Sequence, residues 1–232
     1  MIKLPDPFKY EDPIRYFRDS HAIILSVIDR FEHLVSQARE SGVSVSFAST
    51  NDWDELLNFL VSTAPSHEMD EEGSLFPVIL EKVPSLGFQS SKSPSRFIHE
   101  QHEVMQERSK GLLSLWRSFH LQHTLTPEDE SRFLEVADAL IKLYHEHITQ
   151  ENALIYTSAN DNLLSPTERI AIMLMIKDQH SNRSMTQYLD FEPSGITINT
   201  IESEEADAVS DTQIDVEEED PEEEDTHKGL KK

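Results

Sequence analysis

The fold is decided by the sequence HEMDEEGSLFP, which occupies residues 67–77. His67 and Glu71 are four residues apart, so on a helix their side chains lie on the same face, about 6 Å apart. Leu60 and Leu75 continue the same spacing on either side, as expected for a helix face that packs in a protein core. The sequence therefore predicts a histidine and a glutamate on a buried helix face.

Two long helical patterns are predicted in the first part of the chain. The first begins at Pro13, which suits the first turn of a helix, with Asp12 as its cap, and it ends at Gly42. The second, which contains the stretch above, begins after Asn51 as its expected cap. Because proline removes a backbone donor and clashes with the preceding turn, Pro65 predicts a kink or a break in this helix.

Three further helical patterns follow. One begins near residues 93–95, the next opens at Thr126 and Pro127, and a shorter one follows Ser165 and Pro166. Four amphipathic patterns joined by short connections predict an all-α fold, namely an antiparallel four-helix bundle. The last pattern adds a short C-terminal helix to that bundle.

The composition excludes several other classes of protein. A formal net charge of −24 argues against nucleic-acid binding, and six glycines with no hairpin signals argue against an all-β fold. The absence of cysteine excludes disulfides, zinc fingers and thiolate nucleophiles. The N-terminus has no apolar signal region and no run of 18 apolar residues occurs, so we expect no membrane contact and a cytoplasmic protein.

The end of the chain differs sharply in charge. Residues 201–232 contain 14 acidic residues and three lysines. Such a segment cannot bury enough apolar surface to offset the entropy lost on ordering, so we predict a disordered acidic tail. It serves for solubility or, alternatively, attracts a basic protein partner. The predicted division is a bundle over residues 1–160, an added helix over residues 161–190 and the tail over residues 191–232.

Histidines and glutamates occupy the apolar faces of the four long patterns. Each pattern has one histidine in phase with its apolar residues, and two of them carry a glutamate one turn later, which gives the set His21, His67, Glu71, His102, His147 and Glu151. One such histidine is ordinarily a core residue, but four together with two matched glutamates are not. A buried carboxylate without a partner is costly, and no lysine or arginine lies in phase to neutralise either one. A bound metal cation would neutralise both.

The donor atoms indicate which metal to expect. Nitrogen and oxygen ligands suit iron or manganese better than a closed tetrahedral zinc site. Six ligands are too many for one ion that keeps an open position, but they suit two ions bridged by carboxylates and an oxo or hydroxo group. The Glu-x-x-His pattern of ferritin-like proteins is absent from the predicted bundle.

Residues 10–160 resemble the hemerythrin-like, or HHE cation-binding, family. The resemblance rests on residues 67–77, on His21 after Tyr16-Phe17-Arg18, on Gln101-His102-Glu103 and on the segment from His147 to Glu151. It implies a four-helix bundle with two non-haem iron ions held by the six residues named above. It also implies a small partner such as dioxygen or a related oxidant.

The chain departs from the oxygen carriers of that family at two positions. Gln106 replaces a further histidine, and Glu151 follows His147 by four residues where the carriers have an aspartate at five. The set is nearer the family's iron-repair and iron-sensing branches, although the cysteine motif of the repair proteins is missing. Three functions therefore stay open: iron and oxidant binding, an enzyme that turns over peroxide, nitric oxide or ferrous iron, and a metal-free interaction module.

Several other residues receive a simpler interpretation. His99 lies about 60° from the face of His102 and is the alternative ligand. Tyr144, one turn before His147, is either a core residue or a hydrogen-bond donor to the site. Trp53 and Trp116 are expected in the core. The remaining histidines are expected to face solvent or to lie beyond the bundle: His33, His120, His123, His145, His180 and His227.

Overall fold

The computed structural model describes residues 2–82, 94–156 and 163–189, and the regular elements in these ranges are all helical. The prediction of an all-α fold is thereby confirmed for this part of the chain. The predicted acidic tail lies outside the described residues.

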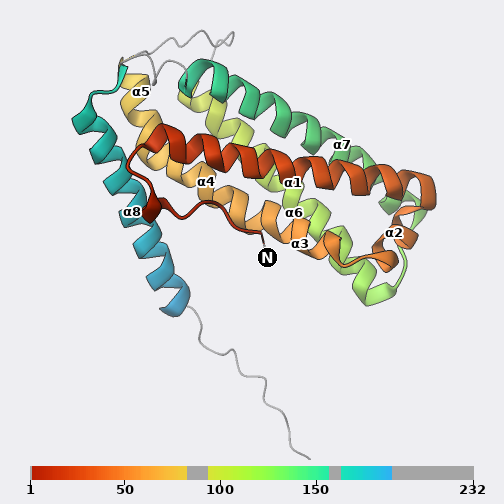
Figure 1. Cartoon of the computed structure of the whole chain (residues 1–232). Coiled ribbons are helices and arrows are strands. Elements are labelled where there is room, and N and C mark those ends of the chain that lie inside the picture. Colours follow the sequence, from red (N-terminus) through yellow and green to blue (C-terminus); the bar gives the residue numbers. More distant parts are fainter. Residues whose placement is uncertain (1, 83–93, 157–162, 190–232) are drawn as a thin grey trace, which may run out of the picture. The chain divides into compact units, whose positions relative to one another are not determined.

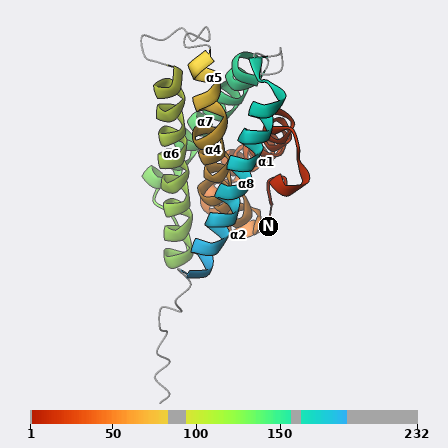
Figure 2. The same cartoon turned by 90° about the vertical axis from the view of Figure 1, so that its left-hand side faces the viewer.

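Four long helical segments lie side by side (Figure 1). They are α1 (Pro13–Ser41), the continuous run from α3 to α5, α6 (Pro94–Gln122) and α7 (Pro127–Gln150). α8 (Pro166–Leu189) packs against this group near α5, as the second view shows (Figure 2).

The limits of α1 are those expected from the sequence. The Asp12 carboxylate accepts a hydrogen bond of 3.1 Å from the backbone N–H of Ile14, which caps the helix. Gly42 ends the helix with a φ of +90°, a value that residues with a side chain rarely adopt. A turn of 3-10 helix, η1 (Pro7–Lys9), precedes α1.

A short helix that the sequence did not predict, α2 (Val43–Ser49), follows Gly42. Its Phe47 ring lies 5.1 Å from the ring of Trp53, centroid to centroid, and Ser46 accepts a hydrogen bond of 3.2 Å from the Trp53 indole. Seven residues are too few to show a helical period, so tertiary packing rather than local pattern defines this helix.

The second long segment is continuous, so the break predicted as one alternative at Pro65 does not occur, whereas the kink stays a prediction. It comprises α3 (Asp52–Asn58), η2 (Phe59–Thr63), α4 (Ala64–Asp70), η3 (Glu71–Leu75) and α5 (Phe76–Lys82). The wider π-helical turn η2 precedes Pro65, and the Ala64 N–H there bonds to the carbonyl of Phe59. This widening accommodates the proline within the helix.

The predicted cap at Asn51 is not formed, because its side chain makes no capping hydrogen bond. Instead, the Thr50 hydroxyl oxygen accepts a hydrogen bond of 3.1 Å from the N–H of Asp52.

The cap predicted for α7 is confirmed. The Thr126 hydroxyl accepts a hydrogen bond of 3.1 Å from the N–H of Asp129, and Pro127 occupies the first turn.

Charged residues recur along all the long helices. Over the ranges that the structure describes, none of them has the length and apolar character needed to cross a bilayer.

The C-terminal helix α8 lies within the predicted segment 161–190 but is not short. It spans 24 residues, as many as α7, so the expectation of a short helix was wrong. Its buried residues Ile172, Met173 and Ile176 belong to a cluster that also contains Ile14 and Phe76. The second half of the helix makes polar contacts with the bundle through His180 and Arg183, which local apolar periodicity cannot show.

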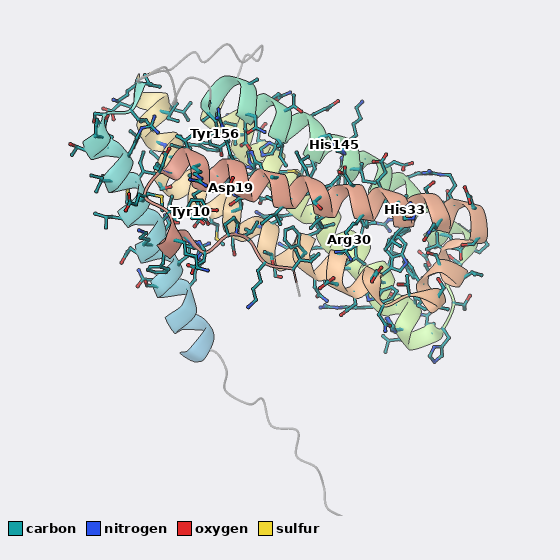
Figure 3. The ribbon with its side chains drawn as sticks, in the orientation of Figure 1. Tyr10, Asp19, Arg30, His33, His145 and Tyr156 are labelled. Carbon is teal, nitrogen blue, oxygen red and sulfur yellow. The ribbon has the colours of Figure 1, made fainter. Side chains whose placement is uncertain are left out.

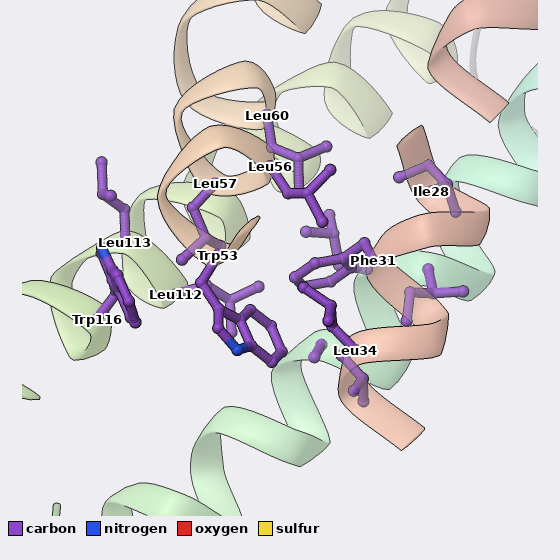
Figure 4. Packing of buried hydrophobic residues seen from close by; sticks show 14 of the residues in the cluster. Ile28, Phe31, Leu34, Trp53, Leu56, Leu57, Leu60, Leu112, Leu113 and Trp116 are labelled. Carbon is purple, nitrogen blue, oxygen red and sulfur yellow. The ribbon is translucent and has the colours of Figure 1, made fainter. Parts of the chain in front are cut away.

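A second and larger apolar cluster fills the bundle toward α2 (Figure 4). Trp53 and Phe31 meet edge to face with ring centroids 5.8 Å apart, and Phe47 meets Trp116 at 4.8 Å. Both tryptophans are buried, as predicted. The two clusters leave the metal-ligand candidates between them.

Candidate metal centre

The structure brings the six predicted residues together inside the bundle. Each long segment contributes one histidine, and the two glutamates follow on the second and fourth segments: His21 from α1, His67 from α4, Glu71 from η3, His102 from α6, His147 from α7 and Glu151 from η4 (Glu151–Tyr156). All six are buried, with at most 3% of the residue exposed.

The six residues form two groups that share one member. In the first group, donor atoms of His21, His67 and Glu71 lie within 4.8 Å of one another. In the second, the same holds for Glu71, His102, His147 and Glu151. Each group has enough nitrogen and oxygen donors to hold one metal ion.

Both carboxylates reach histidines of both groups. The Oε1 atom of Glu71 lies 3.1 Å from Nε2 of His67 and 3.4 Å from Nε2 of His21, while its Oε2 lies 3.8 Å from Nε2 of His102. The Oε2 atom of Glu151 lies 3.1 Å from Nε2 of His147 and 3.3 Å from that of His21. Carboxylates placed in this way can bridge two cations.

Each of the two glutamates begins a π-helical turn. Glu71 is the first residue of η3 and Glu151 the first residue of η4. A π turn widens the helix by one residue, and such turns are frequent at functional sites. The sequence spacing located both glutamates on the inner face, but gave no sign of the π turns.

Several buried donor and acceptor atoms at this centre have no hydrogen-bond partner in the described structure. They include Nε2 of His21, both ring nitrogens of His67, Oε2 of Glu71 and both carboxylate oxygens of Glu151. All of them except Nδ1 of His67 lie 3.1 to 3.8 Å from a partner of opposite charge type but lack hydrogen-bond geometry. Buried polar atoms are ordinarily paired, so their convergence fits a cation at their centre.

Three of the four histidines are oriented by acceptors behind them. Nδ1 of His102 lies 2.6 Å from Glu72, that of His147 lies 2.9 Å from Gln101, and that of His21 lies 3.2 Å from Asn152. Acceptors of this kind keep the proton on Nδ1 and leave Nε2 free to bind a metal.

The charges at the centre are strongly coupled. Burial lowers the pKa of His21, but the carboxylates of Glu151 and Glu71 outweigh burial and raise it to about 10. The pKa of His102 is likewise raised despite burial, by Glu151 and Glu72. Conversely, burial would raise the pKa of Glu151, but His147 and His102 hold it well below its usual range. Metal binding must therefore displace protons from the histidines.

Glu68 is a buried carboxylate that the sequence analysis missed. It is 3% exposed; its Oε2 accepts a hydrogen bond of 2.7 Å from the Gln106 amide, and its Oε1 has no partner. Burial raises its pKa to about 6. Glu68 lies four residues after Ala64 and three before Glu71, so the same periodicity that located Glu71 could have identified it.

Two buried tyrosines, Tyr156 and Tyr144, make different contacts. The hydroxyl of Tyr156, which the sequence analysis also missed, donates a hydrogen bond to Oε1 of Glu71. Tyr144 is buried within the large apolar cluster. One alternative predicted for Tyr144 was a hydroxyl hydrogen bond to the centre. In the structure a different residue, Tyr156 from η4, makes that contact.

The alternative ligand His99 lies outside the group of six. Its side chain is 55% exposed and its Nδ1 lies 3.1 Å from Glu72. His33, His120 and His123 are exposed, as predicted, and His145 is half-buried with Nε2 3.9 Å from Asp29 (Figure 3). With Asp29 and Glu32, His145 makes a further, surface group of potential ligands. His227 lies outside the described residues.

His180 does not lie beyond the bundle, contrary to the prediction. Its Nε2 lies 2.7 Å from the carboxylate of Asp70, a fully buried residue that also accepts from Tyr16 at 2.9 Å and from Arg183. Because α8 is long, it carries His180 and Arg183 back to the helix that holds the centre. Asp70 directly precedes Glu71, so α8 supports the π turn on which that glutamate lies.

Comparison with known proteins gives one finding. The family model described as the hemerythrin HHE cation binding domain matches residues 12–159, which include all six candidate ligands. No curated protein and no solved structure matches the chain.

Proposed function

This chain belongs to the hemerythrin HHE cation-binding domain family, and from that premise we propose that it binds two iron ions and, through them, dioxygen or a related small oxidant. The four long segments then form the antiparallel bundle expected from the sequence. Two iron ions, when bound, supply reversible electron transfer to and from a small oxidant.

The observation that carries the proposal is the pair of buried groups sharing Glu71. We assign His21 and His67 to one ion and His102 and His147 to the other. Glu71 would be shared by both ions, and Glu151 would join it, because an oxygen of Glu151 lies near His21 as well as His147.

Glu68 supports the second position. Its free Oε1 is buried, and its charge acts on the pKa of both His102 and Tyr144. Glu68 belongs to neither group of donors, so we propose that, held by Gln106, it adds negative charge beside His102 without binding the metal. In this arrangement Gln106 orients a carboxylate instead of supplying the nitrogen of the missing histidine.

A second candidate function is turnover of peroxide, nitric oxide or ferrous iron at the same centre. The Tyr156 hydroxyl on Glu71 favours it, because it holds a proton at the carboxylate that faces both groups. Burial raises the pKa of this hydroxyl, and the neighbouring carboxylates add to the effect, so the proton stays on the tyrosine oxygen at neutral pH. Such a proton can be donated to a reduced substrate.

One experiment separates the functions. The purified chain is loaded with ferrous iron under nitrogen and then exposed to air or to peroxide, with His33→Ala as the control variant. An absorption band that disappears when dioxygen is removed supports binding, and sustained loss of peroxide supports the enzyme. Absence of iron uptake would overturn both and leave a metal-free interaction module.

A further inference from the structure

Three tyrosines of the described structure share one kind of partner. Each hydroxyl donates a hydrogen bond to a carboxylate, and the pairs are Tyr156 with Glu71, Tyr16 with Asp70 and Tyr10 with Asp19. The second bond measures 2.9 Å and the third 2.8 Å. A proton can pass between two oxygens at hydrogen-bond distance. Each of the three tyrosines therefore has a proton acceptor already in place.

Ring contacts join the same three tyrosines through one phenylalanine. The Tyr156 ring stacks on the Phe17 ring with centroids 5.9 Å apart, and the Phe17 ring lies 5.2 Å from that of Tyr16. The Tyr16 ring lies 5.6 Å from the Tyr10 ring. A phenyl ring is harder to oxidise than a phenol, but Phe17 fills the gap between two phenols with packed atoms. These four residues form what we call the tyrosine path.

The two ends of the tyrosine path differ in their surroundings. At the inner end, Tyr156 is fully buried and its ring lies 5.2 Å from that of the candidate ligand His21. At the outer end, Tyr10 is half-buried and the side chain of its partner Asp19 is 46% exposed. Phe17 and Tyr16, between the ends, are fully buried. The path therefore leads from the candidate centre to solvent.

The chemistry of peroxide gives such a path a use, and the inference rests on the proposed binding of iron and a small oxidant. Hydrogen peroxide takes two electrons and two protons to become two molecules of water. Two ferrous ions supply the electrons once, and both ions are then ferric. Further peroxide takes its electrons from neighbouring side chains. A phenol gives up an electron more readily than an imidazole, a carboxylate or a phenyl ring.

We infer that Tyr156, Tyr16 and Tyr10 carry oxidising equivalents from the ferric centre to the surface of the chain. For each peroxide molecule, two tyrosine hydroxyls each lose one electron and one proton, so that two waters and two phenoxyl radicals result. The electrons move toward the centre, and each proton moves to the partner carboxylate, which avoids an unpaired charge in the buried interior. A one-electron reductant such as ascorbate then restores the Tyr10 hydroxyl by giving back an electron and a proton.

The test identifies the oxidised residue. The full chain is loaded with ferrous iron, oxidised to the ferric state with ferricyanide, freed of excess reagents and mixed with hydrogen peroxide and a nitroso spin trap. Peptide mass spectrometry then measures the trap on each residue, per bound iron. We expect trapping on Tyr10 in the unmodified chain. Tyr16→Phe keeps the ring but removes the hydroxyl, so trapping on Tyr10 should be lost although Tyr10 and Asp19 are unchanged.

Tyr144→Phe is the matched control, because Tyr144 is a buried tyrosine that belongs to the larger apolar cluster. It should keep the trapping on Tyr10. Equal trapping on Tyr10 in Tyr16→Phe and the unmodified chain, or trapping in the iron-free chain, would show that an oxidant in solution attacks Tyr10 and would overturn the path. A loaded ferric chain with no trapped tyrosine would also overturn it.

Tyr10→Phe gives a second measurement with a variant whose change lies outside the group of six ligands. The path predicts that its peroxide-treated ferric form still shows the electron paramagnetic resonance signal of a tyrosyl radical. Ascorbate should remove this signal more slowly than in the unmodified chain, because the remaining phenols of the path are buried. Equal rates of removal would overturn Tyr10 as the outer end. Absence of iron after loading would instead overturn the proposed function.

Discussion

The interior of the bundle has two regions of opposite character, an apolar region near α2 and the polar candidate metal centre. Toward α2, aromatic rings such as Phe31, Trp53 and Phe133 pack edge to face on buried helix faces. At the candidate centre, the same four segments bury histidines and carboxylates, several of which have unpartnered atoms. Burying apolar surface stabilises a fold, whereas burying unpaired polar groups costs stability. The apolar region near α2 therefore stabilises the bundle, whereas the buried polar groups of the centre cost stability and serve for binding.

The largest expected effect comes from the apolar region. Trp53→Ala should lower the free energy of unfolding by about 3–5 kcal/mol, as is usual when a buried aromatic side chain is truncated. Urea unfolding of the metal-free chain measures it. Iron content per folded chain should be unchanged, because Trp53 lies outside the centre. Loss of iron from folded Trp53→Ala would show that the two regions are not independent.

The centre should instead respond to pH. In the metal-free chain the pKa of His21 is raised to about 10, from an ordinary value near 6.5 in the unfolded chain. The stability that its proton contributes is complete below pH 6.5 and is lost as pH rises toward 10. The free energy of unfolding should thus fall from pH 7 to pH 9, by at most about 1.4 kcal/mol per pH unit for one proton.

Two comparisons sharpen that prediction. His21→Gln should show a smaller decline, and the iron-loaded chain should show none, because metal binding already requires neutral histidines. A steeper decline in the iron-loaded chain than in the metal-free chain would contradict the assignment of His21 as a ligand.

Removing a contact between α8 and Asp70, next to the centre, should lower the free energy of unfolding by a smaller amount. Arg183→Ala removes one partner of the buried Asp70 carboxylate, while Tyr16 and His180 remain. Breaking a buried pair costs about 3–5 kcal/mol, and since the Arg183 side chain is 26% exposed we expect about 2 kcal/mol. Arg169→Ala, which breaks a more exposed pair with Asp12, is the control and should cost less than about 1 kcal/mol. An equal cost for both variants would mean that Asp70 does not depend on α8.

The smallest effect is expected from the predicted tail. Truncation after Thr200 removes none of the six ligands, so the melting temperature and iron content should stay within measurement error. A clear drop in melting temperature would show that residues 201–232 contact the bundle.

Sequence patterns predicted the structural features that a single helix determines by itself. The caps at Asp12 and Thr126 follow from a capping residue placed directly before a proline. The all-α class and the inward phase of the histidines and glutamates follow from spacings of three and four residues. Glu68 obeys the same spacing and was missed for want of a matched histidine.

Features that depend on distant partners were not predicted. The burial of Asp70 requires Arg183, which lies 113 residues later on a helix expected to be short. The π turn at Glu151 contains neither glycine nor proline, and the π turn at Glu71 contains Gly73 two residues later, so no shared sequence signature marks the two turns.

The central claim is that one buried centre holds two ions that share Glu71. The most direct test is the number of iron atoms per chain after anaerobic loading with ferrous iron and removal of the excess. We predict about two in the unmodified chain and in His33→Ala, and fewer in His147→Ala. One or no iron atom in the unmodified chain, or two retained in His147→Ala, would contradict the account.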